Sequence, residues 1–138
     1  SLLFVGGLPK VTEIIRAKLL SRAKEILVGG MHGIGDKALP GIFGNKYRQL
    51  NPETAALFSS LLEANPMDVY LQCIDELLKT DATDAISKLT APLLLITGTE
   101  DQYAPPASLG AFSTSPSNCK KTLELPDCGH MPFLEDLV

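Results

Sequence analysis

Asp101 and His130 are the two residues whose types and positions in this sequence could support proton-transfer chemistry. Asp101 follows the apolar run Leu93–Ile96, and His130 follows the run Thr122–Leu125. A carboxylate can orient a histidine and stabilise its charged form while the histidine takes a proton from a nucleophile or a water. The pair therefore predicts a general base at His130 and an orienting acid at Asp101, two members of a nucleophile–His–acid triad.

These two side chains need strands that end at the same place in space. Leu93–Ile96 is apolar without alternation, which is typical of a strand buried on both faces of a parallel sheet. Leu2–Val5 and Thr122–Leu125 are predicted as its partner strands. Because active sites of open α/β sheets lie at the carboxyl ends of strands, the two loops are expected to bring Asp101 and His130 together.

A long, mostly helical stretch separates the first predicted strand from the second. Thr12–Val28 carries apolar residues at helical spacing. Asn51-Pro52 and Asn65-Pro66 each place an N-cap residue before a proline at the first helical position, which predicts two further helix starts.

The expected fold class is α/β, a partial sheet of three strands with a helical insertion after the first. Residues 1–9 and 89–138 are assigned to the sheet part and residues 10–88 to the insertion. Three parallel strands alone leave open edges, and the chain begins in a predicted strand and ends in a predicted helix. We therefore expect a piece of a longer protein, able to form a homo-oligomer through the exposed edge at residues 2–5.

Composition narrows the class of protein and of partner. The chain has 138 residues, 45% of them hydrophobic and 20% charged, with a net charge of −4. This excludes a disordered chain and argues against nucleic acid as a partner. No apolar run reaches the roughly 18 residues of a membrane span. Cysteines at 73, 119 and 128 lack metal-ligand spacing and are interpreted as free thiols in a reducing cytoplasm, although a Cys119–Cys128 bridge stays open.

The acid and histidine motifs resemble those of the α/β-hydrolase family, whose chain order is nucleophile, acid, histidine. Gly98–Asp101 with Ala104-Pro105 looks like the acid loop of that family, and Cys128–Glu135 looks like its last strand and histidine loop. By the same resemblance, residues 1–7 correspond to its sixth strand and residues 10–88 to its helical cap.

Within that family, the cap looks most similar to those of 3-oxoadipate enol-lactonase-type esterases. The similarity lies in Gly29-Gly30-Met31, Asn51-Pro52-Glu53-Thr54 and the segment from Tyr70 to Asp84. The resemblance implies hydrolysis of a small-molecule carboxylic ester or lactone with no cofactor or metal. An apolar substrate pocket is expected at Met31, Phe43, Tyr47, Phe58, Met67, Tyr70 and Met131.

The sequence departs from the family pattern at the nucleophile. It contains no Gly-x-Ser-x-Gly, and the nucleophile elbow of the family lies before the sixth strand, upstream of Ser1. Cys128 is not favoured as a substitute, because the side chains of residues two apart on a loop rarely point at each other. We expect the nucleophile in a missing N-terminal half and the present chain, by itself, to be inactive.

Several alternatives fit the same motifs. An Asp nucleophile in the missing half would make the protein an epoxide hydrolase or a dehalogenase, and a different cap pocket would make it a C–C bond hydrolase. A non-catalytic, hydrolase-like piece that acts by association through its sheet edge is the alternative from another functional class.

Overall fold

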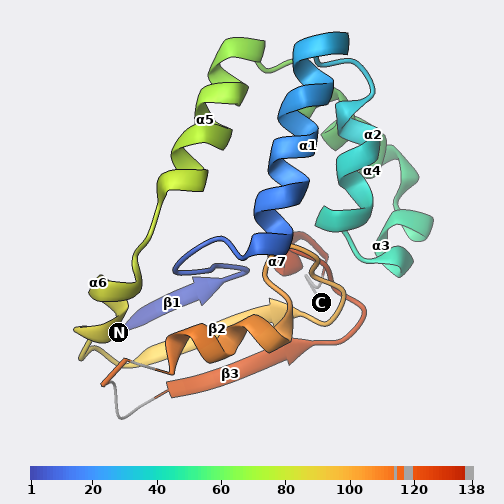
Figure 1. The fold of residues 1–138 in the computed structure, drawn as a ribbon. Helices are drawn as coiled ribbons and strands as arrows, with labels where there is room; N and C mark the ends of the chain where they lie inside the picture. Colours follow the sequence, from blue (N-terminus) through green and yellow to red (C-terminus); the bar gives the residue numbers. More distant parts are fainter. Residues whose placement is uncertain (114, 117–119, 136–138) are drawn as a thin grey trace.

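The computed structural model describes residues 1–113, 115–116 and 120–135 of the chain. Its elements follow one another as a strand, a group of helices, and two further strands with short helices between and after them (Figure 1). The strands are β1 (Leu2–Val5), β2 (Leu93–Gly98) and β3 (Lys120–Leu125). The helices are α1 (Glu13–Gly29), α2 (Ile34–Ile42), α3 (Asn45–Leu50), α4 (Pro52–Glu63), α5 (Met67–Lys79), α6 (Thr83–Ser87), the 3-10 helix η1 (Pro106–Phe112) and α7 (Pro132–Glu135).

The strands form one parallel sheet with β2 in the centre, in the order β1-β2-β3. β2 is hydrogen-bonded on both sides, and Leu93 and Leu95 are each only 2% exposed. Their face packs against Ile86 of α6 and Phe112 of η1, and Phe4 of β1 joins this core. The predicted α/β class, with a three-stranded partial sheet, is thereby confirmed.

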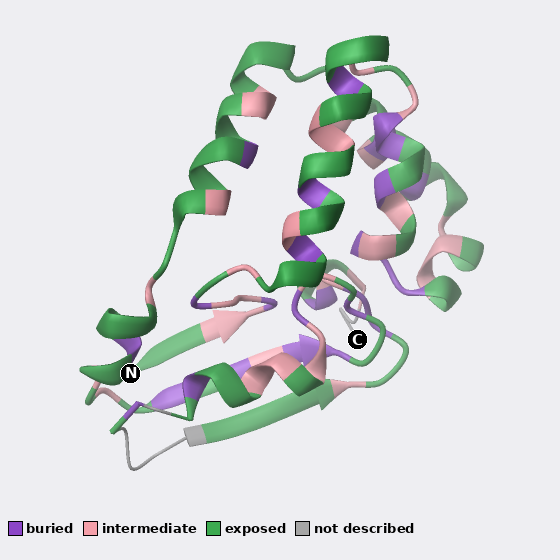
Figure 2. Cartoon of the chain, viewed as in Figure 1, coloured by how far each residue is buried: buried purple, intermediate pink, exposed green. Residues whose placement is uncertain are grey.

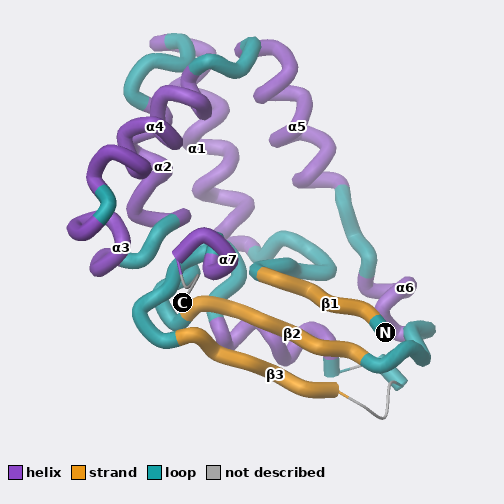
Figure 3. Tube along the Cα trace, turned by 180° about the vertical axis from the view of Figure 1, so that it is seen from behind, coloured by secondary structure: helices purple, strands orange, loops and turns teal. Residues whose placement is uncertain are grey.

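The opposite face of the sheet is open, which corrects the prediction that β2 is buried on both faces. Burial alternates along the strand, and Leu94 is 37% exposed. Leu3, the register partner of Leu94 on β1, is 56% exposed, and Leu123, the partner of Ile96 on β3, is 46% exposed. Figure 3, which views the molecule from behind, shows this open face toward the reader, and Figure 2 shows β1 and β3 largely exposed. The cause is that α6 and η1 both pack on the other side.

Helices α1 to α5 form a separate layer above the sheet (Figure 1). α1 starts where Thr12 Oγ1 accepts a hydrogen bond from Ile15 N, and it ends before Gly30, which has a positive φ of 73°. α1 packs against α5 through Ile15, Leu19 and Ile74. The same apolar periodicity that predicts the helix therefore also provides the face that buries it.

The second pair of helices, α2 and α4, crosses at very short range. Gly35 of α2 lies directly against Ser59 of α4, and the Ser59 hydroxyl donates to Asp36 Oδ1 at 2.7 Å. Ala38 and Ala55 are both buried in these helices. Small residues on both helices let the two backbones approach closely.

The predicted helix start at Asn65 is wrong. α5 begins at Met67, and the Asn65 side chain donates instead to the carbonyls of Leu61 and Leu62 at the end of α4, at 3.0 and 2.9 Å. Asn51 does precede α4, but its amide nitrogen also donates backwards, to the last turn of α3. In such short connections an amide can serve the unpaired carbonyls of the preceding helix as readily as the N–H groups of the next.

The two segments that connect the sheet with the helical layer, one after β1 and one after α5, are joined to each other. Lys10 and Asp81 form an isolated antiparallel bridge, and their side chains are 2.8 Å apart. This ion pair is exposed, and Lys10 holds the pKa of the Asp81 carboxyl well below its usual range. Within the described residues, none of the helices is both long and apolar enough to cross a bilayer.

Replacing Gly35 by Ala is expected to lower the free energy of unfolding. The added Cβ would lie 2.7 Å from Ser59 Cα and closer still to two of its oxygens. Overpacking costs about 1–3 kcal/mol, and the better helix propensity of alanine recovers about 1 kcal/mol, so we expect a net loss of up to about 2 kcal/mol in urea denaturation. Gly29→Ala is the control, because nothing lies within 4 Å of that position. Equal stability of the two variants would contradict the close crossing.

Candidate active site

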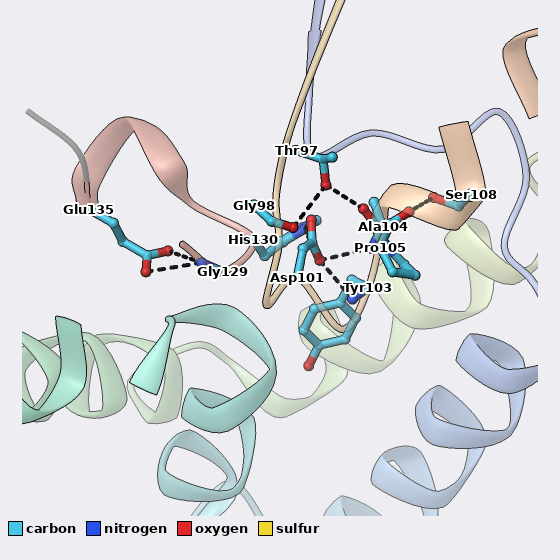
Figure 4. Close-up of polar contacts among 10 residues, drawn as sticks. All are labelled: Thr97, Gly98, Asp101, Tyr103, Ala104, Pro105, Ser108, Gly129, His130 and Glu135. Atoms are coloured by element: carbon cyan, nitrogen blue, oxygen red, sulfur yellow. Dashed lines mark hydrogen bonds and ion pairs between the residues drawn. The ribbon is translucent and has the colours of Figure 1, made fainter. Parts of the chain in front are cut away.

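The loop after β2 fixes the carboxylate of Asp101. Its side chain is 0% exposed, and its Oδ1 accepts hydrogen bonds from the backbone N–H groups of Tyr103 and Ala104, each at 2.8 Å. Thr97, at the end of β2, donates its hydroxyl to the Ala104 carbonyl at 2.7 Å and so closes the loop (Figure 4). The loop therefore presents one orientation of a carboxylate that water cannot reach.

His130 meets this carboxylate from the loop after β3. Its Nδ1 lies 3.0 Å from Oδ2 and 3.1 Å from Oδ1 of Asp101, and its side chain is 30% exposed. A carboxylate oxygen only accepts, so Nδ1 is inferred to carry the proton and Nε2 of the neutral ring keeps its lone pair. Among the described residues, Nε2 has no hydrogen-bond partner, which leaves it available to a reactant.

The backbone around His130 is held as tightly as its ring. His130 N donates to the carbonyl of Ile42, at the end of α2, at 2.6 Å. Gly6, just after β1, has a φ of +58°, and a Cβ there would lie 2.8 Å from the His130 carbonyl oxygen and 3.1 Å from Nδ1. Only glycine allows both this conformation and this approach. Segments after all three strands thus converge on one imidazole.

Glu135 of α7 is a positioning residue that the sequence reasoning did not single out. Its carboxylate accepts from Gly129 N at 2.9 and 3.0 Å and from Gly44 N at 2.7 Å. Figure 4 shows its bonds to Gly129, the residue before His130. The only available signal was a carboxylate six positions after the glycine, within the first turn of a predicted helix. That signal does not indicate which backbone N–H groups the carboxylate would bind.

An apolar cavity of about 500 Å³ lies beside His130. Of the residues predicted for a substrate pocket, Phe58, Tyr70 and Met131 line it. Met31, Phe43, Tyr47 and Met67 do not: Phe43 is 1% exposed and packs against Tyr47, and Met67 is 43% exposed on the surface. The cavity is lined instead by residues that the sequence reasoning passed over, including Ile15, Leu19, Arg22, Ile74 and Tyr103.

The missed wall residues of α1 had a visible signal. Ile15, Leu19 and Arg22 stand at helical spacing on one face, so a cavity beside α1 would be lined by all three. Tyr103 lies within the acid loop, and its ring centroid is 5.2 Å from that of His130. No pattern in the sequence places it there, because its position depends on the fold of the loop.

The cysteines and the residues able to bind a metal do not form a cluster within the described residues. Cys128, just before Gly129 and His130, is buried and Cys73 is exposed, whereas Cys119 lies outside the described residues. Across the described ranges, no three His, Cys, Asp or Glu side chains gather closely enough to hold a metal ion.

A family model described as alpha/beta hydrolase fold matches residues 9–137 of the chain. The search of curated proteins found no match to the chain. Among solved structures, an enol-lactonase from Burkholderia xenovorans LB400 is similar over 96% of this chain and 50% of its own, with 21% identity and a TM-score of 0.82. An alpha/beta hydrolase enzyme from a Medee basin deep-sea metagenome library is similar over 97% of this chain and 50% of its own, with 15% identity and a TM-score of 0.83.

A thermophilic esterase from Thermogutta terrifontis is similar over 96% of this chain and 49% of its own, with 18% identity and a TM-score of 0.78. At such identities the likeness concerns the fold. The chain spans about half the length of each of these three structures.

Replacing Glu135 by Gln is expected to loosen the histidine loop. The change keeps the shape of the side chain but removes its charge and one acceptor oxygen, and hydrogen bonds to a charged group are each worth about 1.5–3 kcal/mol. We expect a loss of about 1–3 kcal/mol in urea denaturation, with shifted amide resonances at Gly129 and Gly44. Glu124→Gln, at an exposed residue of β3, is the control. A stability equal to that of this control would show that the carboxylate does not hold the loop.

Proposed function

The chain belongs to the α/β-hydrolase fold family, and from this we propose that it supplies the acid–base half of an enzyme that hydrolyses small-molecule carboxylic esters or lactones. The observation that carries the proposal is the contact between His130 Nδ1 and the buried Asp101 carboxylate, with His130 on the wall of an apolar cavity. This geometry suits a base that must be oriented and then charged next to an apolar substrate.

In the proposed reaction, Nε2 of His130 takes the proton of the nucleophile as that group attacks the carbonyl carbon. The imidazolium that forms is stabilised by Asp101, at 3.0 Å from Nδ1. His130 then gives the proton to the leaving alcohol oxygen as the carbon–oxygen bond breaks. In the second half, His130 takes a proton from water, whose oxygen attacks the covalent ester, and returns it to the nucleophile while the acid is released.

We propose that the nucleophile comes from outside these residues. The sequence contains no Gly-x-Ser-x-Gly, and the chain spans about half the length of the solved structures that it resembles. The same outside segment would supply the backbone N–H groups that bind the developing oxyanion. By itself the 138-residue chain is then expected to have no esterase turnover.

The helical residues 10–88 are proposed to act as a cap over the site. The supporting observation is that α1, α4 and α5 provide Ile15, Leu19, Phe58 and Ile74 as one apolar wall of the cavity. Such a wall can bind the acyl chain or the ring of the substrate while His130, which lines the same cavity, transfers the proton. The preference for esters and lactones over other substrates draws support from neighbours described as an enol-lactonase and an esterase.

His130→Ala, in the intact protein, is expected to lower kcat/KM for p-nitrophenyl ester hydrolysis by about 10²–10⁴-fold, because the base is lost. His32→Ala is the matched control, since the side chain of His32 is 97% exposed and does not line the cavity. Undiminished hydrolysis in His130→Ala would overturn the assignment. Release of halide or opening of an epoxide, with no ester hydrolysis, would instead favour an Asp nucleophile.

A further inference from the structure

Arg22 of α1 is a cation on the wall of the mostly apolar cavity beside His130, which Lys10 also lines. Its Nη2 donates to the Tyr103 hydroxyl at 2.8 Å and its Nη1 to the Tyr70 hydroxyl at 3.3 Å. Burial lowers the pKa of this guanidinium, but the Tyr103 and Tyr70 hydroxyls more than offset this and raise it, so the group stays charged. Two of its five N–H groups are used by these hydroxyls, and no carboxylate lies in salt-bridge range of it among the described residues.

A second cavity, of about 250 Å³, lies on the other side of Arg22 and Tyr103. These two residues line both cavities and so form the partition between them. Figure 4 shows the Tyr103 ring turned away from the Asp101 carboxylate, toward the helices. The second cavity is thus one side chain removed from His130, whose ring centroid is 5.2 Å from that of Tyr103.

The second cavity carries an excess of positive charge. Lys18, Arg22 and Lys37 line it together with one carboxylate, Glu25. Lys37 pairs with Glu25 at 2.6 Å, and its hydrogen bond lowers the pKa of that carboxyl. The Lys18 ammonium has only the Gln102 amide oxygen, at 3.3 Å. Within the described part of the chain, Lys18 and Arg22 therefore face the same cavity with no ion-pair partner.

We propose that this second cavity is a carboxylate-binding site serving the reaction at His130, an inference that rests on the proposed function. The planar fork of an arginine and a neighbouring ammonium match the two oxygens of a carboxylate. Hydrolysis of an ester or lactone at His130 always generates such a group, and a substrate can also carry one of its own. The carboxylate of a substrate and that of the released acid have the same chemistry. Only the side chains of Arg22 and Tyr103 separate the second cavity from the cavity beside His130, so the site lies close to either carboxylate.

Direct binding tests the site without requiring turnover. Hexanoate and its neutral counterpart hexanamide are titrated into the protein by calorimetry, and hexanoate is expected to bind at least tenfold more tightly. Arg22→Gln is expected to weaken hexanoate binding by about tenfold or more, since it removes charge-assisted hydrogen bonds. Lys18→Gln removes an exposed charge and is expected to cost about two- to fivefold. Lys18→Gln, which lines only the second cavity, is expected to leave hexanamide binding unchanged.

The control for these variants is Lys24→Gln, an equal change of charge on the same helix at an exposed residue that lines neither cavity. Arg22→Lys keeps the charge without the fork and should give an intermediate affinity, with circular dichroism showing that the helices are retained. Equal binding of hexanoate and hexanamide would overturn the proposal, as would unchanged hexanoate binding in both Arg22→Gln and Lys18→Gln. Sulfate binding as tight as that of hexanoate would overturn the assignment to carboxylates.

Kinetics of the intact protein then separates the two sources. The p-nitrophenyl monoester of glutarate carries a free carboxylate, and p-nitrophenyl pentanoate is its neutral match. If the site binds a substrate carboxylate, Lys18→Gln raises KM for the glutarate ester alone. If it binds the released acid, KM stays the same for both esters and inhibition by added pentanoate weakens. An absence of ester hydrolysis would refute the proposed function, whereas the calorimetric result would still decide whether the anion site exists.

Discussion

The arrangement of the site depends on burying one carboxylate, that of Asp101, where solvent does not reach it. Burying such a group is costly unless its oxygens gain hydrogen bonds. Two backbone N–H groups and the His130 ring provide them here. The loop after β2 must therefore fold back on itself, and the loop after β3 must lie against it. The direction of β2 and β3, parallel and adjacent, makes this meeting possible.

The helical layer is joined to this pair through hydrogen bonds as well as through the packing of Tyr103 and Met131 against the helices. Ile42 at the end of α2 accepts from His130 N, and Glu135 bridges Gly44 to Gly129. The residues that shape the cavity and the residues proposed to do the chemistry thus share one rigid junction. A shift of α2 against the sheet would move the imidazole with it, so substrate binding against the helices and the orientation of His130 are physically linked.

Local patterns predicted much of the fold because their causes are local. The strands around Leu93 and Thr122, the helix after Thr12 and the α/β class all follow from short apolar runs, from apolar residues at period 3.6 and from capping chemistry. The same reasoning failed where a residue has two possible partners. Asn65 serves the helix before it, and Leu94 faces solvent, since which helices cover a sheet face is not written in the strand itself.

The sequence by itself determined the chemical candidates, Asp101 and His130, and the strands that carry them, because an acid and a histidine after successive apolar runs is a pattern of neighbours along the chain. Only the tertiary structure decided what surrounds them. It selected Phe58, Tyr70 and Met131 for the cavity and left Met31 and Met67 outside it. It also placed Glu135 and Arg22, whose most distant partners lie 91 and 81 residues away along the chain. Such contacts depend on how whole elements pack, and no local period in the sequence encodes them.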